Sequence, residues 1–144
     1  MTTTTNETQD AALARARGWL SELFAPWVQA LHLSPEAVSS DSVVLRLPFD
    51  SSLCRVGGTL CGQALMSAAD TAMVIAISAQ LGEFRPMTTV SITTSFMRPI
   101  ADGDALITAR VIKPGRTLTF GEIEIRSAVD GKVAVHATTT YAML

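Results

Sequence analysis

The chain has 144 residues, of which 48% are hydrophobic and 17% charged, and its formal net charge is −2. This length allows one domain with a substantial core, and this composition excludes an intrinsically disordered chain. The charges are scattered, with no basic run and no interleaved aromatic residues, so we expect no nucleic-acid partner.

Polar residues and then a helical pattern define the N-terminal region. Residues 1–9 are polar and resemble no export signal, so we expect a disordered tail and a cytoplasmic protein. Apolar side chains recur at helical spacing over residues 10–25, and Pro26 interrupts this pattern. The sequence therefore predicts a helical region over residues 10–33. It is followed by a core over residues 40–144, within a single domain covering residues 10–144.

Residues 62–81 form a strongly apolar stretch and predict a long helix. Ala, Leu and Met dominate it, it contains no Pro, and Gly82 follows at a position that favours a helix end. A helix that is apolar on all sides must be enclosed by protein or by lipid. Polar residues dilute the stretch and no basic or aromatic belt flanks it, so we expect a protein core and no membrane partner.

Asp70 is the one charged residue inside this stretch, far from either end of the predicted helix. A carboxylate is costly to bury unless it is paired, neutralised or used in a reaction. The residues alone leave two interpretations equally open. Asp70 is either a structural acid paired with a hydroxyl or an arginine, or a functional acid in a cleft.

One strand pattern precedes the predicted helix and four follow it. The strands are predicted over residues 41–48, 87–97, 104–112, 117–127 and 132–143. Gly121 marks a bulge or bend, and Asp130-Gly131 marks a hairpin turn. Short connections predict that the last four strands follow one another as antiparallel hairpins. Together these elements predict an α+β protein, in which a curved antiparallel sheet wraps around one central helix.

Alternation within residues 87–97 predicts which side chains share a face of the strand. Strict alternation separates a row of hydroxyls from a more apolar row. The first row is Thr89, Ser91, Thr93 and Ser95, and the second is Val90, Ile92, Thr94 and Phe96. The hydroxyl row is expected either to face solvent or to line a subunit interface.

Several short motifs, met in order, resemble the hotdog-fold thioesterase superfamily, and within it the PaaI-type acyl-CoA thioesterases. They are GTLCGQ at 58–63, AADTA at 68–72, Thr89, FMRP at 96–99, Gly103-Asp104 and residues 137–141. The resemblance covers residues 43–144. It implies the hotdog fold, a curved antiparallel β-sheet wrapped around a long central helix, here with an extra N-terminal helix.

The resemblance implies hydrolysis of an acyl-CoA thioester in a site between two subunits of a homodimer or homotetramer. It implies Asp70 as general base or nucleophile, the Gly62 N–H as oxyanion donor and Thr89 as an orienting hydroxyl. Independently, a helix N-terminus offers unpaired N–H groups and a positive dipole end, which suit a developing oxyanion. No cofactor or metal is implied. Basic residues that the resemblance places near coenzyme A phosphates are Arg98, Lys113 and Arg116.

Three positions depart from the family pattern. Cys61 stands where the family usually has His, Gln63 where it has a second Gly, and Arg55 where an Asn is frequent. These side chains belong to the part of the site that binds and polarises the thioester. Their replacement leaves open an alternative function, a non-catalytic protein that binds acyl-CoA or another small ligand.

Two other catalytic schemes are disfavoured by the residues present. A nucleophilic Cys61 needs a basic partner, and neither His32 nor His136 has a spacing that argues for one. A dehydratase on the same fold normally uses a His–acid pair, and no His stands near Asp70 in the sequence. Arg98 also has a structural interpretation, an ion pair with Asp102 or Asp104. Aromatic residues at 19, 24 and 27 predict a docked helix, which we expect to cover the acyl end of the pocket.

Overall fold

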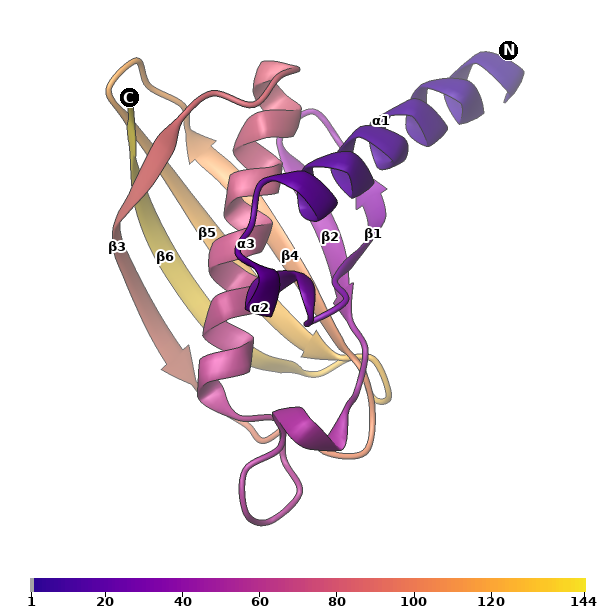
Figure 1. Ribbon diagram of the computed structural model, residues 1–144, viewed down its shortest axis with the longest axis vertical. Helices are drawn as coiled ribbons and strands as arrows, with labels where there is room; N and C mark the ends of the chain where they lie inside the picture. Colours follow the sequence, from indigo (N-terminus) through magenta and orange to yellow (C-terminus); the bar gives the residue numbers. More distant parts are fainter. Residues whose placement is uncertain (1) are drawn as a thin grey trace.

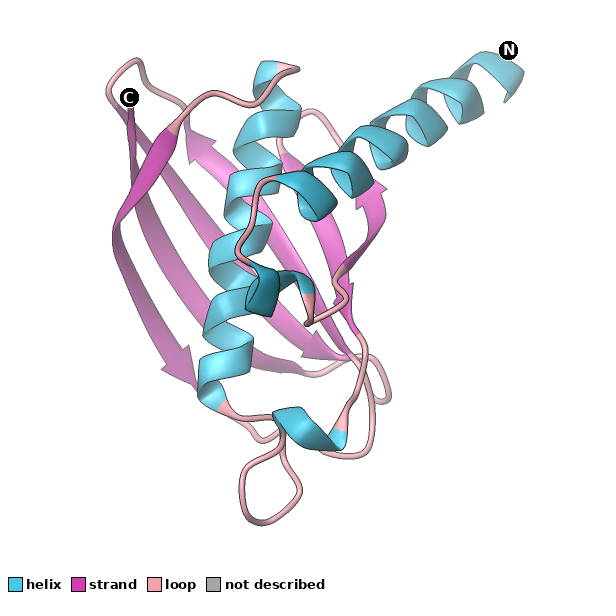
Figure 2. Ribbon diagram, in the orientation of Figure 1, coloured by secondary structure: helices cyan, strands magenta, loops and turns pink. Residues whose placement is uncertain are grey.

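A curved antiparallel sheet wraps around one long helix, as the sequence predicts (Figures 1 and 2). The computed structural model describes residues 2–144, with side chains from Thr8 onward. The chain adopts the hotdog fold, with α3 as its central helix and α1 as an additional N-terminal helix. The helices are α1 (Thr2–Glu22), α2 (Pro26–Gln29), the short 3-10 helix η1 (Ser51–Leu53) and α3 (Gly62–Leu81). The strands are β1 (Ser34–Val38), β2 (Ser42–Leu47), β3 (Met87–Phe96), β4 (Ala105–Lys113), β5 (Leu118–Ser127) and β6 (Val133–Met143).

The strand order, β1-β2-β4-β5-β6-β3, corrects the prediction that the last four strands form successive hairpins. Strand β3 pairs with β6 at the far edge of the sheet and not with β4. The β3–β4 connection instead crosses beneath the start of α3. There the Leu60 N–H donates to the Ile100 carbonyl, and Thr59 pairs with Ala101. A short link between two strands predicts a hairpin, and sequence spacing alone does not show this crossing.

The N-terminal region differs from the prediction in two ways. Helix α1 begins at Thr2, so residues 2–9 are helical. The sequence predicts a disordered tail there because threonine, which dominates this segment, is only a weak helix former. Met1 lies outside the described residues. Strand β1 was not predicted at all. It contains Pro35 and lies at the edge of the sheet, where a residue without an N–H donor is tolerated.

Helix α3 packs most of its surface against the concave face of the sheet. Cys61 precedes it as the N-cap, and Gly82 ends it in the left-handed region with φ of 77°. Gly121 of β5 lets the helix approach closely, because a Cβ there would lie 2.4 Å from the Met73 Cε. The predicted irregularity at Gly121 falls instead on the facing strand β4, between Val111 and Lys113.

The enclosure of α3 is incomplete, contrary to the expectation for a helix apolar on all sides. One stripe, comprising Gln63, Met66, Asp70 and Val74, is only partly covered, whereas residues on the opposite face are fully buried. Among the described residues, α3 is the one helix long and apolar enough to span a membrane. However, 61% of its most apolar segment is buried within the protein, as in a core helix.

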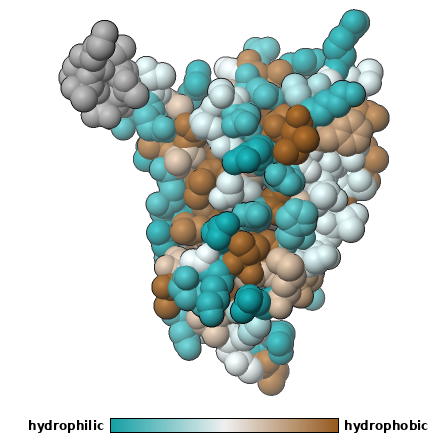
Figure 3. Space-filling model, turned by 180° about the vertical axis from the view of Figure 1, so that it is seen from behind, coloured by the Kyte–Doolittle hydropathy of each residue, from teal (hydrophilic) through white to brown (hydrophobic). Residues whose placement is uncertain are grey.

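The outer face of the sheet mixes polar and apolar side chains. Figure 3 views the molecule from this side and shows separate apolar patches among hydrophilic residues. Phe120 and Ile112 are exposed there, beside the charged residue Glu122. His136 also faces outward, with its Nε2 3.8 Å from Glu122. His136 therefore lies on the face of the sheet opposite α3 and Asp70.

Candidate active site

Asp70 lies at the middle of α3, where two hydroxyl groups from the sheet meet its side chain. Thr89 Oγ1 of β3 donates to Asp70 Oδ1 at 2.8 Å. The Tyr141 hydroxyl of β6 donates to the same oxygen and also lies 3.0 Å from the Asp70 carbonyl oxygen. Burial, and then the negative charge of Asp70, raise the pKa of Tyr141 far above its ordinary value. The phenol therefore stays protonated and can act as a donor at all ordinary pH values.

A β-bulge at Val90 aims Thr89 at Asp70. The register of β3 against β6 shifts between Thr89 and Ser91, so the strict alternation predicted for this strand is broken. Thr89 pairs with Tyr141 and Ile92 pairs with Thr139, and both partners are inward-facing residues of β6. Without the bulge, Thr89 would share the outward face of Ser91. One extra residue thus directs the Thr89 hydroxyl to Asp70.

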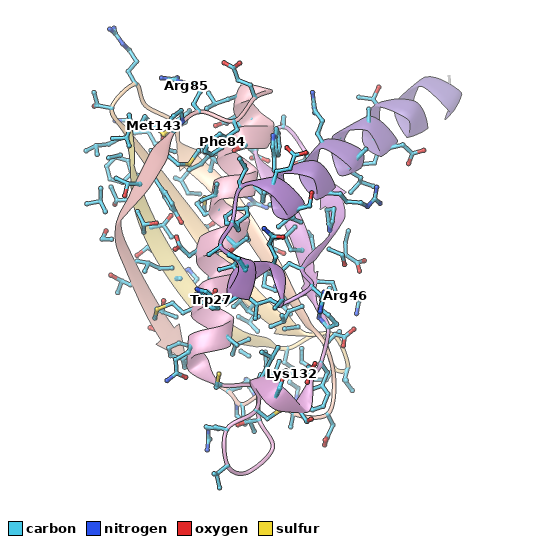
Figure 4. All side chains as sticks on the ribbon, viewed as in Figure 1. Trp27, Arg46, Phe84, Arg85, Lys132 and Met143 are labelled. Carbon is cyan, nitrogen blue, oxygen red and sulfur yellow. The ribbon has the colours of Figure 1, made fainter. Side chains whose placement is uncertain are left out.

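Asp70 opens onto an apolar cavity of about 380 Å³ between α3, α2 and β3. Its wall combines Phe24 and Trp27 from the N-terminal region with Met66 and Val74 of α3 and Ile92 of β3. Trp27, labelled in Figure 4, extends from α2 beside α3 and is 64% exposed. The volume lies within the usual range for small-ligand pockets, and one carboxylate among apolar walls matches their usual composition. The N-terminal region therefore forms part of the wall of the cavity next to Asp70.

Gly62 lies at a second cavity, of about 370 Å³, at the N-terminus of α3. As the first residue of the helix, Gly62 has an N–H with no acceptor inside the helix. In the described part of the chain, no backbone acceptor is recorded for it. The Phe96 ring covers Gly62 so closely that a Cβ at position 62 would lie 3.3 Å from Phe96 Cζ. The cavity also contains Arg55 and Arg98, so it combines backbone N–H groups with positive charge.

The other candidate residues fall into three places. Cys61 caps α3, accepting through Sγ from the Ala64 N–H at 3.4 Å, whereas Gln63 lines the Asp70 cavity. Lys113 and Arg116 lie at the turn between β4 and β5. Because β4 begins near the α3 N-terminus and has nine residues, this turn is about 26 Å further along the sheet. Within one chain, the structure therefore does not bring Lys113 or Arg116 to Gly62.

Arg98 forms neither of the ion pairs considered from the sequence. Asp104 instead accepts from Arg46 at 3.0 Å and from the Phe49 N–H at 2.7 Å. In the described part of the chain, no salt bridge is recorded for Arg98, and its side chain is exposed at the Gly62 cavity. Arg98 is thus placed to bind an anion, while Asp104 secures the turn that precedes β4. Over residues 8–144 no group of three or more His, Cys, Asp or Glu side chains is placed to hold a metal.

Sequence reasoning missed Tyr141 as a member of the site. It is the only tyrosine in the chain and is completely buried, yet its partner lies 71 residues away in sequence. A polar ring at an inward-facing position of the last strand was the available signal, since a buried Tyr hydroxyl needs a partner. The sequence marks Gln63 as a candidate for substrate binding and Trp27 as part of a docked helix, but their common place in the Asp70 cavity follows only from the three-dimensional packing.

The chain belongs to the thioesterase superfamily, because residues 57–134 match that family. A relative from Caenorhabditis elegans, named as an esterase, is 30% identical over 76% of this chain, and the match spans 65% of that relative's length. A conserved protein from Pseudomonas aeruginosa has a similar structure, with 28% identity, a TM-score of 0.77, and coverage of 86% of this chain and 98% of that one. The PaaI protein of the E. coli phenylacetic acid degradation operon is similar in fold, with a TM-score of 0.80 at 19% identity over 93% of this chain and 94% of that one.

Proposed function

We propose that this protein is an acyl-CoA thioesterase in which Asp70 acts as general base or nucleophile. The observation that carries the proposal is a carboxylate oriented by Thr89 at the edge of a largely apolar cavity. The membership of the thioesterase superfamily and the esterase name of a relative support a hydrolase.

The proposed site is completed by a second copy of the chain. Strand β3 is an edge strand with exposed backbone, and its side chains include exposed Val90 and Phe96 (Figure 1). Such an edge favours pairing with another strand. Near the beginning of β3, Thr89 contacts Asp70, and at the end of β3, Phe96 lies against Gly62. An antiparallel copy would therefore bring Gly62 of the partner subunit toward Asp70. We propose a homodimer as the minimal active unit, with a homotetramer as a further assembly.

The general-base mechanism then proceeds in two steps. Asp70 removes a proton from water as the water oxygen attacks the thioester carbonyl carbon, and the carbonyl π electrons move to its oxygen. The N–H of Gly62 of the partner subunit donates to that oxyanion. The tetrahedral intermediate collapses, the C–S bond breaks, and the proton held by Asp70 goes to the departing thiolate. In the nucleophilic variant an Asp70 oxygen attacks the carbonyl carbon, the C–S bond breaks and coenzyme A leaves as the thiolate. Water then hydrolyses the resulting anhydride, which releases the acid and restores the Asp70 carboxylate. Neither route needs a metal or cofactor.

The two cavities suggest where each half of the substrate binds. The apolar cavity beside Asp70 suits a small aliphatic or aromatic acyl group, because Phe24, Trp27 and Ile92 line it. The cationic side chains of Arg55 and Arg98 suit the phosphates of coenzyme A. A cytoplasmic location and the absence of nucleic-acid and membrane partners remain predictions from the sequence.

A non-catalytic acyl-CoA-binding protein is the alternative. It is favoured by Cys61, whose Sγ caps the helix at the position where the resemblance expects a polarising His. In that case the cavities would bind the ligand without turnover. The Gly62 N–H and the carboxylate of Asp70 would still be present, which is why hydrolysis is the preferred proposal.

A thioester panel tests the proposal. Release of free thiol is measured for acyl-CoA substrates from acetyl to phenylacetyl with wild type, Asp70→Asn and the control Asp130→Asn. Asp130 lies in an exposed turn, and Asn preserves that turn. We expect Asp70→Asn to lose at least about 10²-fold in kcat and Asp130→Asn to retain activity. Equal rates for wild type and Asp70→Asn exclude the proposed role of Asp70. No turnover together with measurable coenzyme A binding supports the alternative.

A further inference from the structure

The two oxygens of the Asp70 carboxylate have different surroundings. Oδ1 accepts from both Thr89 and Tyr141. In the described part of the chain, no hydrogen bond to Oδ2 is recorded, while the side chain borders the apolar cavity. A carboxylate bound through one oxygen is held against rotation. It presents its other oxygen as the available acceptor or nucleophile.

Tyr141 is the more rigid of the two donors. It is completely buried on β6, which lies between β5 and β3, and it pairs with Thr119 on one side and Thr89 on the other. Thr89, in contrast, belongs to an exposed edge strand next to a bulge. The position of the Tyr141 hydroxyl is therefore fixed by the interior of the sheet, and it also lies 3.0 Å from the Asp70 carbonyl oxygen.

We propose that Tyr141 is a positioning residue, whose buried hydroxyl holds Asp70 Oδ1 and leaves Oδ2 as the oxygen that acts on water or the thioester. This inference rests on the proposed hydrolase function and assigns the reacting atom within it. Tyr141 acts through Asp70 and makes no contact with the substrate.

Loss of the Tyr141 hydroxyl frees the Asp70 side chain to rotate. A smaller fraction of enzyme molecules then presents Oδ2 correctly, so kcat falls. Because Tyr141 does not contact the substrate, its loss should leave KM nearly unchanged.

The test compares Tyr141→Phe with the matched control Thr139→Val. Thr139 is also buried and inward-facing on β6, but its hydroxyl has no partner among the described residues, so Thr139→Val removes a buried hydroxyl without touching Asp70. For Tyr141→Phe we expect a fall of at least about tenfold in kcat, with KM little changed. A merely structural disturbance of the cavity would raise KM as well. The kcat and KM of Thr139→Val should match those of the wild type. An unchanged kcat in folded Tyr141→Phe overturns the inference.

A second measurement does not depend on turnover. Because Tyr141 is the only tyrosine, tyrosine labelled with 13C at Cζ gives a single NMR signal. Because Asp70→Asn removes the charge from the group that accepts the Tyr141 hydrogen bond, we expect this signal to move in Asp70→Asn and to stay in place in the control Asp130→Asn. An unchanged signal in folded Asp70→Asn overturns the inference, even if the enzyme is active. If no thioester is hydrolysed, the hydrolase proposal fails, while this measurement still decides whether Tyr141 holds Asp70.

Discussion

Gly62 and Asp70 lie on the same helix, yet they border two cavities that share no lining residue. Eight residues separate them in sequence, so they are about 12 Å apart along the axis of α3. A thioester carbonyl cannot contact both groups of one chain. If both act on one substrate, the site must combine Gly62 of one chain with Asp70 of another.

Mixing of two inactive variants tests this shared site. Asp70→Asn removes the carboxylate, and Gly62→Pro removes the N–H at position 62. If the chains exchange freely, hybrid dimers contain one site with both groups intact, and the mixture should recover about a quarter of wild-type activity. Each variant mixed with itself under the same exchange conditions is the control. If the chains are shown to exchange and the mixture still recovers no activity, the result contradicts a site between subunits.

Gly62→Pro and Gly62→Ala separate the role of the N–H from that of the small side chain. Proline is tolerated at the first helical position, and Cys61, with φ of −71° and ψ of 151°, already has the extended conformation preferred before proline. Both variants place a Cβ near the exposed Phe96 ring, but only proline removes the donor. We expect Gly62→Pro to lose about 10²–10³-fold in kcat. Gly62→Ala should lose far less of its kcat. Equal losses in the two variants would mean that contact between the added Cβ and the Phe96 ring, and not loss of the N–H, causes the effect.

Trp27→Ala should change acyl selectivity. Trp27 lies against the Asp70 cavity from α2 and is 64% exposed, so its removal enlarges the cavity with little effect on the core. We expect the ratio of kcat/KM for long over short acyl groups to rise by about tenfold, since each methylene in an apolar pocket is worth about 1–3 kcal/mol. Phe84→Ala is the control, because Phe84 is a partly exposed aromatic beyond the C-terminal end of α3 and does not line the Asp70 cavity (Figure 4). An unchanged ratio for Trp27→Ala would place the acyl group elsewhere.

Asp104 links stability to pH. The Phe49 N–H, and then the Arg46 guanidinium, hold the pKa of Asp104 below its ordinary value. A depressed pKa in the folded state stabilises the protein above the unfolded-state pKa, about 4, and this contribution is lost as the pH falls through the folded-state pKa.

Asp104→Asn should therefore reduce the free energy of unfolding at neutral pH. Because one third of the Asp104 side chain is exposed, we expect only about 1 kcal/mol. The difference from wild type should shrink below about pH 4, where the wild-type carboxylate is itself protonated. Urea unfolding at several pH values measures this, with Asp102→Asn as control because Asn tolerates the positive φ at that position. A constant difference at all pH values would assign the effect to packing.

Local patterns in the sequence predicted the helices and strands of the core, but not all of the pairings between the strands. Composition alone located α3 within its observed bounds, and alternation located the strands that follow it. Pairing of β3 with β6 was missed because it depends on a crossing connection. Strand β1 was missed because Pro35 and its short polar segment carry little strand propensity.

Some residues of the candidate site were also predictable from the sequence, and others were not. Asp70 stood out because a charge within an apolar helix requires an explanation, and the resemblance pointed to Gly62 and Thr89. The direction of Thr89 could not be predicted, because regular alternation gives the wrong face when a bulge intervenes. Tyr141 and the N-terminal wall of the cavity depend on contacts between residues distant in the chain, which no local pattern encodes.

The bulge at Val90 makes the contact between Thr89 and Asp70 depend on chain length as well as on residue identity. Deleting a single codon there would restore regular pleating and turn the Thr89 hydroxyl to the outside, although every residue of the proposed site would remain encoded. An insertion at the same point in a relative would do the reverse. Within this superfamily, gain or loss of the threonine contact can thus arise through insertions and deletions that a residue-by-residue comparison would overlook.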